Sequence, residues 1–404
     1  MIIRERYLKQ IRPFYDSEMI KVIMGVRRCG KSTLLQQIIS ELKVSHDLDD
    51  DQILYLNFED FRYSHLLESQ SFYDYVEPCI LTDKRMYLFF DEIQNIDKFE
   101  LVINSFRATH DNVSIFLTGS NTKLLSGELA THLGGRTLSF RMLPFSFAEY
   151  VQLGEHTVSA DELLSQYMQF GGFPLVCKES SYESKYVQLR NLYDSIVYQD
   201  VIRKNRYHSA ITIETILNYL VANSSTTISP KKIVSELKKE GIEITIPTLY
   251  EYLNTFQESG LVQLIPRYDI RGKRMLSFQE KSYACDLGLF SILKNRIKDE
   301  LSYITETLVF NELVSRAYTV YIGKTYKGEV DFIAERSDGW RCYIQVAYLM
   351  VTEETRNREF GAFRSIRDNY PKFVISQDPI CSDRDGIKHL RLTDFLLDPD
   401  LLSS

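Results

Sequence analysis

The sequence predicts an α/β protein of several domains, led by a parallel sheet with helices on its faces. The chain has 404 residues, which divides into two or three domains at about 150 residues each. From residue 19 to about 145, short apolar runs alternate with helix-like stretches, as is typical of a parallel sheet covered by helices. Hydrophobic residues make up 44% and charged residues 25%, so we exclude a largely disordered chain.

Five strands are predicted in this first domain. Their ranges are Met19–Met24, Ile53–Phe58, Met86–Phe90, Val113–Thr118 and Thr137–Arg141. The first four are nearly uninterrupted apolar or β-branched runs, which is typical of strands buried on both faces. We therefore expect these four to lie centrally in the sheet.

A helical cap and a small third domain are expected next. Apolar residues recur at helical spacing between about 146 and 225, so we place the sheet domain at 1–150 and the cap at 151–225. Ser229-Pro230 then starts a helix, and a second helix from Pro247 precedes two short strands. This order predicts a winged-helix domain over 226–285.

The last part of the chain, 286–404, predicts a second α/β domain. Its expected elements are a helix at Thr305–Arg316 and strands at Thr319–Ile322, Glu329–Ala334, Tyr343–Val346 and Lys372–Ser376. Runs of this length, bounded by turn residues, are typical of strands.

Charge and cysteine content exclude several classes of protein. The formal net charge is −7, so the whole surface does not coat nucleic acid or anionic membrane, although a local basic patch stays open. The six cysteines show no C-x-x-C spacing, which argues against a structural zinc site and a disulfide scaffold. The N-terminus has no apolar core of a signal peptide, and no run of 18 apolar residues occurs. We expect a cytoplasmic protein without a membrane partner.

The strongest motif is a phosphate-binding loop. Residues 25–32 read GVRRCGKS, which satisfies G-x-x-x-x-G-K-[ST] between a predicted strand and a helix opened by Thr33. The glycines let backbone N–H groups face a phosphate chain, Lys31 supplies a positive charge, and Ser32 should ligate Mg²⁺. For Arg27 and Arg28, contact with phosphate and a structural role are both open alternatives. The residues expected to contact the nucleotide here are Gly25, Val26, Arg27, Arg28, Cys29, Gly30, Lys31, Ser32 and Thr33.

A pair of carboxylates ends the third predicted strand. Tyr87-Leu88-Phe89-Phe90 is apolar and leads directly into Asp91 and Glu92. Ligands of open α/β sheets bind at the carboxyl ends of the strands. We expect Asp91 to hold Mg²⁺ through water and Glu92 to polarise the attacking water. The alternative is an ordinary surface pair.

The strand at 53–58 lies in sequence between the loop and Asp91, which favours an additional-strand ATPase over a nucleoside kinase.

Two further predictions concern the γ-phosphate. Ser120 and Asn121 follow the fourth strand and are candidates for sensing the nucleotide, although a simple strand-end turn would look alike. Arg136 is a candidate arginine finger, in its own subunit or a neighbour, and a solvated arginine is the alternative.

The motifs together resemble a known family. MGVRRCGKSTLL, YLNFED, YLFFDEIQ, LTGSN, LLSGELATHLGGRTLSFRMLPFSFAEY and GGFP resemble the bacterial and archaeal ATPases grouped as AAA-type family 14. The segments 306–313, 328–333 and 343–347 resemble the companion domain of unknown function 4143. The resemblance implies an ATP-binding P-loop NTPase with ATP and Mg²⁺ as cofactors, a winged helix and a restriction-endonuclease-like tail. Its biological role is poorly defined across the family.

The resemblance also suggests roles for two isolated residues. Gly171-Gly172-Phe173-Pro174 is similar to the glycine-any-proline element of STAND-type ATPases, which implies that Pro174 packs near the adenine. A turn between two helices would use the same residues. Asn57 resembles a polar residue that restrains the catalytic glutamate in some AAA proteins, an assignment we do not adopt.

The predicted winged helix bears on whether the protein binds nucleic acid. The second helix would enter a groove and 267–281 would form the wing, with Arg267, Arg271, Lys273, Arg274 and Lys281 as its basic residues. Glu251 and Glu258 on the helix would repel phosphate, so protein binding is an alternative to binding of double-stranded DNA.

In the C-terminal domain, Glu306, Asp331 and Gln345 resemble a nuclease layout that has lost one acid and, at Ala347, its lysine. Nuclease activity is therefore doubtful.

These observations lead to one main function and two alternatives. The fold class is α/β: a P-loop NTPase sheet with a helical cap, a winged helix and a nuclease-like α/β domain. We expect an ATPase, open to homo-oligomerisation, whose nucleotide state moves the two rear domains on DNA. The alternatives are a STAND-like switch or scaffold that binds proteins, and a magnesium-dependent nuclease.

Overall fold

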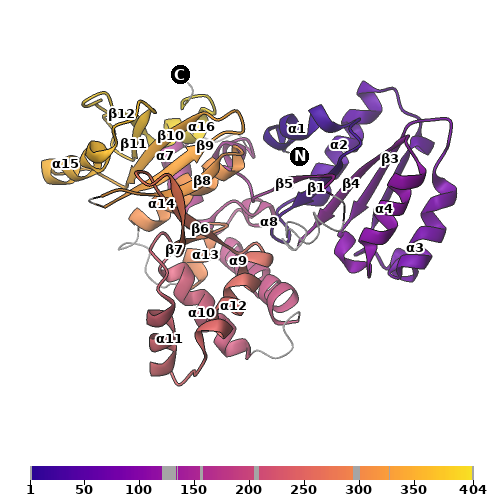
Figure 1. The fold of residues 1–404 in the computed structure, drawn as a ribbon, viewed down its shortest axis with the longest axis horizontal. Helices are drawn as coiled ribbons and strands as arrows, with labels where there is room; N and C mark the ends of the chain where they lie inside the picture. Colours follow the sequence, from indigo (N-terminus) through magenta and orange to yellow (C-terminus); the bar gives the residue numbers. More distant parts are fainter. Residues whose placement is uncertain are drawn as a thin grey trace. The chain divides into compact units, whose positions relative to one another are not determined.

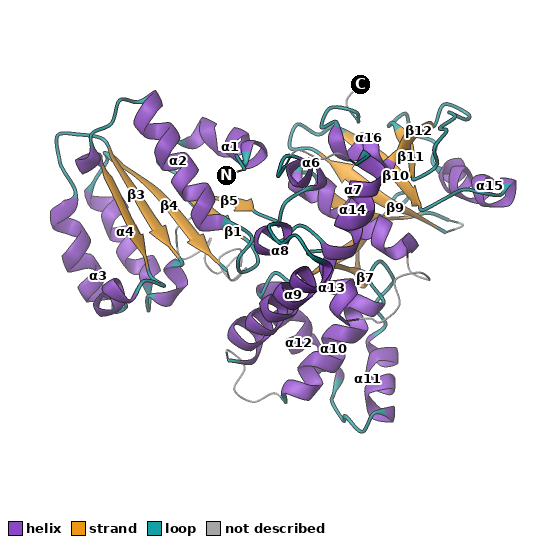
Figure 2. Cartoon of the chain, turned by 180° about the vertical axis from the view of Figure 1, so that it is seen from behind, coloured by secondary structure: helices purple, strands orange, loops and turns teal. Residues whose placement is uncertain are grey.

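The chain folds as two compact units in the computed structural model. The first unit contains residues 1–142 and 258–260, and the second contains 143–257 and 261–404. The described residues are 2–120, 133, 135–154, 158–203, 209–293, 301–326 and 328–402, without the side chains of 277–279. Figures 1 and 2 show the elements of each unit.

The first unit is built on a five-stranded parallel sheet. Its strands are β1 (Ile20–Met24), β2 (Ile53–Asn57), β3 (Met86–Asp91), β4 (Val113–Gly119) and β5 (Thr137–Arg141). They lie in the order β2-β3-β4-β1-β5, and every pairing is parallel. The sequence prediction of these five strands is confirmed.

The predicted place of β2 is wrong. β2 lies at an edge of the sheet, and only Leu56 of its five residues is buried. The strand that separates β1 from β3 is β4, although it follows both of them in sequence. An apolar run such as ILYLN shows that a strand forms, but its neighbours are set by chain crossovers that the run does not encode.

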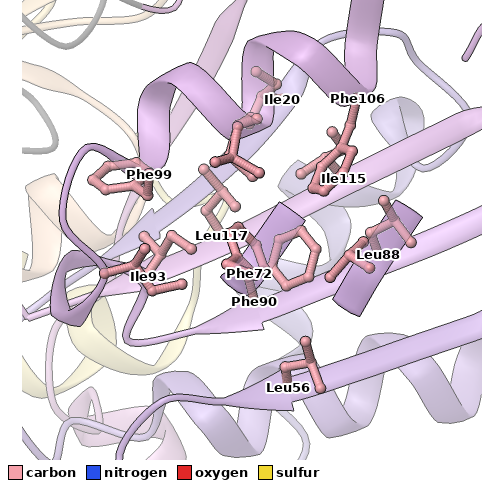
Figure 3. Packing of buried hydrophobic residues seen from close by; sticks show 14 of the residues in the cluster. Ile20, Leu56, Phe72, Leu88, Phe90, Ile93, Phe99, Phe106, Ile115 and Leu117 are labelled. Carbon is pink, nitrogen blue, oxygen red and sulfur yellow. The ribbon is translucent and has the colours of Figure 1, made fainter. Parts of the chain in front are cut away.

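Helices and alternating strand side chains form the core of this unit. The helices are α1 (Glu5–Ile11), α2 (Lys31–Ser45), α3 (Ser69–Val76) and α4 (Phe99–Thr109). Strand residues such as Leu88, Phe90 and Ile115 pack with Phe72 of α3 and Phe106 of α4 (Figure 3). The ring centroids of Phe72 and Phe90 lie 4.9 Å apart in an edge-on arrangement. This core fixes β3 and β4, whose carboxyl ends carry the candidate site.

The second unit begins with the predicted helical stretch. Its helices up to residue 258 are α6 (Phe147–Val151), α7 (Ala160–Phe170), α8 (Pro174–Cys177), α9 (Tyr182–Ile196), η7 (Val197–Ile202), α10 (Ala210–Ala222), α11 (Pro230–Lys239) and α12 (Ile246–Glu258). The later helices are α13 (Gly288–Leu293), α14 (Leu301–Ser315), α15 (Glu353–Gly361) and α16 (Leu392–Leu397). Serine N-caps at Ser159 and Ser229 start α7 and α11, because their side chains accept a backbone N–H of the first turn.

A mixed seven-stranded sheet joins the expected third and fourth domains. Its strands are β6 (Val262–Asp269), β7 (Arg274–Ala284), β8 (Thr319–Lys324), β9 (Glu329–Glu335), β10 (Arg341–Ala347), β11 (Lys372–Ser376) and β12 (Lys388–Arg391). Their order is β12-β11-β10-β9-β8-β6-β7, with β6 parallel to β8. The expected wing, 267–281, therefore does not stand apart as a free hairpin. It is the edge of the C-terminal sheet. The short strand β12 was not predicted.

No helix in the described part of the chain is long and apolar enough to span a lipid bilayer.

Candidate functional site

The loop between β1 and α2 has a backbone that requires its glycines. A Cβ on Gly25 would lie 2.2 Å from the carbonyl oxygen of Met142. Gly30 has a φ of 107° and is the N-cap of α2, where a side chain would be strained. Arg28 has a φ of 64° without being glycine. The backbone thus curls tightly at the N-terminus of a 15-residue helix, the geometry that binds phosphate.

Lys31 is folded back into this loop. Its side chain is only 3% exposed, and its ammonium donates to the carbonyl oxygen of Gly25 at 3.1 Å. The same ammonium lies 3.2 Å from a carboxylate oxygen of Glu92. Burial alone would lower the pKa of Lys31, but the nearby Glu92 carboxylate outweighs burial, and the pKa lies above its usual value. The lysine is therefore charged and paired with the candidate catalytic acid.

Asp91 is held at the end of β3 by two hydroxyl groups. Its side chain accepts hydrogen bonds from Thr118 Oγ1 and, at 2.9 Å, from the Tyr55 hydroxyl. The Thr118 hydroxyl oxygen also accepts the backbone N–H of Glu92 at 2.9 Å. Asp91 is fully buried, so these bonds compensate for its desolvation. The sequence did not predict these contacts of Tyr55 and Thr118, because they join separate strands.

Glu92 has a strained backbone and a restrained side chain. Its φ of 54° and ψ of 47° are left-handed, which is unfavourable for a glutamate and typical of functional sites. Gln94 Nε2 donates to Glu92 Oε2 at 2.5 Å and to Ser120 Oγ at 3.3 Å. Burial would raise the pKa of Glu92, but the Lys31 charge and the Gln94 hydrogen bond lower it below its usual value. Gln94 thus links the predicted sensor Ser120 to the predicted base.

Other residues of the loop take structural positions. Cys29 is fully buried, and its carbonyl oxygen accepts a hydrogen bond of 3.1 Å from the buried Arg4. Arg27 pairs with Glu59 on the loop after β2. Val26 is buried, whereas Arg28 and Thr33 are exposed. Asn57 accepts the backbone N–H of Glu59, so the restraint on Glu92 comes from Gln94 instead.

The donors at this site fit a magnesium ion shared with phosphates. Ser32 lies half-buried in the first turn of α2, and Asp91 ends β3. A hydroxyl and a carboxylate are hard oxygen donors of the kind that Mg²⁺ takes together with substrate phosphates and water. Among the described residues no group of three or more His, Cys, Asp and Glu side chains is arranged to hold a metal without such a substrate.

One predicted site residue falls outside the described part of the chain, and another is not brought to the loop. Asn121 lies outside the described residues. Arg136 is exposed, and its carbonyl oxygen accepts the N–H of Ile20 at 2.9 Å, at the start of β1. At about 3.3 Å per residue, β1 separates this point from the loop by about 16 Å. A finger role for Arg136 within its own subunit is therefore wrong, since parallel strands start at the edge opposite the site.

In the second unit, the glycine pair before Pro174 accommodates a buried carboxylate. Asp286 accepts the N–H groups of Gly172 at 2.7 Å and Gly288 at 2.8 Å. A Cβ on Gly171, whose φ is 72°, would lie 1.8 Å from Asp286 Oδ1. Burial raises the pKa of Asp286 to about 7. Pro174 itself begins α8. These contacts explain the glycines by packing, without reference to a nucleotide.

The three nuclease-like residues do come together, around an unexpected lysine. Glu306 on α14 accepts hydrogen bonds from the Tyr283 hydroxyl at 2.7 Å and from Lys281 at 3.1 Å. Asp331 accepts the N–H of Val346 at 2.8 Å, and Gln345 accepts the N–H of Asp331 at 3.3 Å. Glu306, Asp331 and Gln345 line one cavity, whose wall therefore combines α14, β9 and β10 as expected.

Lys281 comes from β7 and occupies the centre of the acidic group. Its ammonium lies 2.8 Å from Glu329, 3.1 Å from Glu306 and 4.0 Å from Asp331, with its side chain 4% exposed. Burial would lower the pKa of Lys281, but these carboxylates outweigh burial and raise it. The prediction that Lys281 is a basic residue of a DNA-binding wing is wrong, because the side chain is buried and paired. Its sequence position, far from Ala347, gave no sign of this.

The sheet order, the loop and the paired acids define the first unit as a P-loop NTPase of the AAA class. Residues 17–151 match the family model described as "AAA domain". The chain belongs to the family of an uncharacterized protein from Haemophilus influenzae, with 34% identity over 404 residues, 98% of this chain and 99% of the relative. An uncharacterized protein of Methanocaldococcus jannaschii is 32% identical over 86% of this chain and 79% of its own length.

A second family model matches residues 161–300 and is described as a domain of unknown function, DUF8612. The sequence had instead suggested domain of unknown function 4143 for the C-terminal stretch.

Two solved structures show a remote likeness. The Thermotoga maritima RuvB Holliday junction branch migration motor is 14% identical, with a TM-score of 0.31, over 65% of this chain and 89% of that one. The Aeropyrum pernix ORC1 protein in complex with DNA is 11% identical, with a TM-score of 0.29, over 78% of this chain and 94% of that one.

Proposed function

We propose that the protein binds ATP with Mg²⁺ at the loop before α2 and hydrolyses it. The observation that carries this proposal is the group of Lys31, Asp91 and Glu92, which lie at the carboxyl ends of β1 and β3 beside a phosphate-binding helix N-terminus. Lys31 would contact the β- and γ-phosphates, and Ser32 with Asp91 would hold the metal. Mg²⁺ would neutralise charge on the phosphates.

Glu92 is the proposed base for the attacking water. Its ionised form is favoured by Lys31 and Gln94, and a base must be ionised to accept a proton. Ser120, at the end of β4, contacts the same glutamine and is the proposed sensor, with Asn121 following it in sequence. Binding of phosphate would draw Lys31 away from Glu92 and free the carboxylate for water. The expected test is loss of ATP binding in Lys31→Ala, and loss of turnover without loss of ATP binding in Glu92→Gln.

We propose that the protein assembles into a homo-oligomer and that Arg136 contacts the nucleotide of a neighbouring subunit. Its exposed side chain lies at the sheet edge opposite its own loop, so the nucleotide that it contacts would have to be that of a neighbouring subunit. Mixing Arg136→Ala with Lys31→Ala protein should restore activity in hybrid interfaces. Mass measurement in solution with and without ATP and Mg²⁺ tests the assembly itself, and a strict monomer would contradict it.

We propose DNA as the partner that the second unit engages, with nucleotide state moving that unit. Helices α11 and α12 and the β6–β7 hairpin retain the element order of a winged helix, and Tyr250 on α12 is 39% exposed. Filter binding of duplex DNA at varied salt tests this partner, since phosphate contacts weaken steeply with salt. In the nuclease-like cavity we propose a binding or scaffolding role without DNA hydrolysis, because the Lys281 ammonium occupies the position between the carboxylates where a metal would bind.

A STAND-like switch is the second candidate, and one contact favours it. In this function the Lys31–Glu92 ion pair would open as ATP binds, which suits a slow two-state device that engages proteins. Turnover slower than nucleotide release, with no DNA affinity at 50 mM salt, would select this function.

A further inference from the structure

The second unit contains a cavity formed by three turns that the sheet order brings together. β6 pairs with β8, and the N–H of Ile270 donates to the carbonyl oxygen of Lys324 at 3.1 Å. The turn after β6 therefore lies beside the turn after β8, and the segment between α15 and β11 completes the wall. The cavity measures about 560 Å³ and is lined by Ile270, Arg271, Thr325, Tyr326, Arg364, Ser365, Ile366, Arg367 and Asp368.

Three arginines give this cavity, which we call the arginine cavity, a positive charge. Arg271, Arg364 and Arg367 are exposed, and within the described ranges none of them forms an ion pair. The one acid of the lining, Asp368, lies 3.7 Å from Lys372 and accepts a hydrogen bond from Tyr343. Unpaired arginines in a chain of net charge −7 raise the local potential, and their planar groups bind phosphate oxygens in pairs.

Other arginines of the same unit show that this grouping is unusual. Arg267 pairs with Glu329, Arg336 with Asp338, Arg341 with Glu335 and Arg358 with Glu359. Arginines on the neighbouring strands and helix thus form ion pairs, whereas the three in the arginine cavity form none within the described ranges, although the Asp269 carboxylate accepts the backbone N–H of Arg271 at 3.1 Å. Three exposed arginines beside one aspartate that already contacts Lys372 leave an excess of positive charge, which points to an anionic partner.

Tyr326 indicates the form of that partner. Tyr326 is 81% exposed and lines the same cavity as Arg271. An exposed aromatic ring next to a positively charged groove is the arrangement on which unpaired bases stack while the backbone follows the charge. Bases inside a duplex cannot stack on such a ring.

The adjoining cavity limits where a phosphate chain can lie. It measures about 570 Å³ and shares Thr325, Arg364 and Ser365 with the arginine cavity. Glu306, Glu329, Asp331 and Glu359 line it, with Arg358 beside them. Its carboxylates repel phosphates, so the backbone is confined to the arginine side.

We propose that the arginine cavity binds the phosphate backbone of single-stranded nucleic acid and that Tyr326 stacks on one of its bases. This inference deepens the proposed function by naming a nucleic-acid surface apart from the α12 face, and it requires no ATP. The test is fluorescence anisotropy of a labelled 20-nucleotide oligothymidylate with the full chain, without nucleotide, from 50 to 300 mM salt. With three phosphate contacts, the log–log salt slope should be about −2.

The double variant R364A/R367A should lower the magnitude of this slope by about 1.4 and weaken binding at least tenfold at 50 mM salt. Tyr326→Ala should weaken binding about tenfold with the slope unchanged, because stacking releases no counterions. The matched control R62A/R190A removes two positive charges from exposed positions elsewhere and should leave binding within twofold. All variants are surface changes, and their circular dichroism melts confirm folding.

Several outcomes would overturn the proposal. They are no binding by the unaltered chain at 50 mM salt, an equal loss in the control, displacement of the oligonucleotide by polyglutamate at equal charge, and oligonucleotide binding by Tyr326→Ala within twofold of the unaltered chain. ATP binding measured on the same samples separates this failure from failure of the proposed ATPase.

Discussion

Replacing Glu92 by glutamine should tighten ATP binding. The Glu92 carboxylate and the Lys31 ammonium lie 3.2 Å apart, and their side chains are 8% and 3% exposed. Their Coulomb attraction is about 5 kcal/mol at an effective dielectric of about 20, and desolvation offsets a large part of it. Suppose that about 1.4 kcal/mol of the net attraction is lost when Lys31 leaves Glu92 to contact phosphate. Glu92→Gln lacks the carboxylate charge and does not lose this free energy on binding, so it should bind ATP about tenfold more tightly.

Hydrolysis in the same variant should fall by a factor of about 10² to 10⁴, the usual contribution of a positioned base. Titration calorimetry with ATP and Mg²⁺ measures the binding, and phosphate release measures the turnover. Glu18→Gln is the control, because Glu18 is 82% exposed and pairs with Arg107 instead of Lys31. Weaker or unchanged ATP binding in Glu92→Gln would refute the view that this ion pair competes with the nucleotide.

Further predictions concern four other side chains. Lys31→Ala should abolish tight ATP binding in calorimetry, since it removes a ground-state phosphate contact. Gln94→Ala should lower kcat about tenfold at constant KM. It should also move the acidic limb of the pH–rate profile to higher pH, because loss of its hydrogen bond raises the pKa of Glu92. An acidic limb at the same pH would contradict this positioning role. Burial lowers the pKa of Lys21 to about 7, so the folded state binds fewer protons than the unfolded state between pH 7 and 10.5. Stability to urea should therefore rise by up to about 1.4 kcal/mol per pH unit in that window, and Lys21→Met should remove the dependence. Mixed Arg136→Ala and Lys31→Ala proteins should regain ATPase activity, and no recovery would remove the role of Arg136 between subunits.

Local patterns in the sequence were sufficient for the strands and the loop. The runs at 53–57, 86–91 and 113–119 are apolar enough to indicate strands, and the glycine spacing of 25–30 fixes the loop. The order of the strands was not predictable in the same way, because the placement of β4 between β1 and β3 depends on crossovers.

The side chains that were missed act across long sequence distances. Thr118 bonds to Asp91 from the next strand of the sheet, and Arg4 reaches the loop from before α1. Gln94 was within the quoted motif but had no pattern to mark it, since its role depends on the left-handed turn at Glu92. Lys281 was assigned to a wing because a local charge count cannot show that a lysine is buried among acids of α14 and β9.

The central claim is tested most directly by equilibrium binding of ATP to the purified chain in the presence of Mg²⁺. We expect one nucleotide per chain, with the affinity lost in Lys31→Ala and increased in Glu92→Gln. A correctly folded chain that binds no adenine nucleotide at millimolar concentration would contradict the assignment of this site.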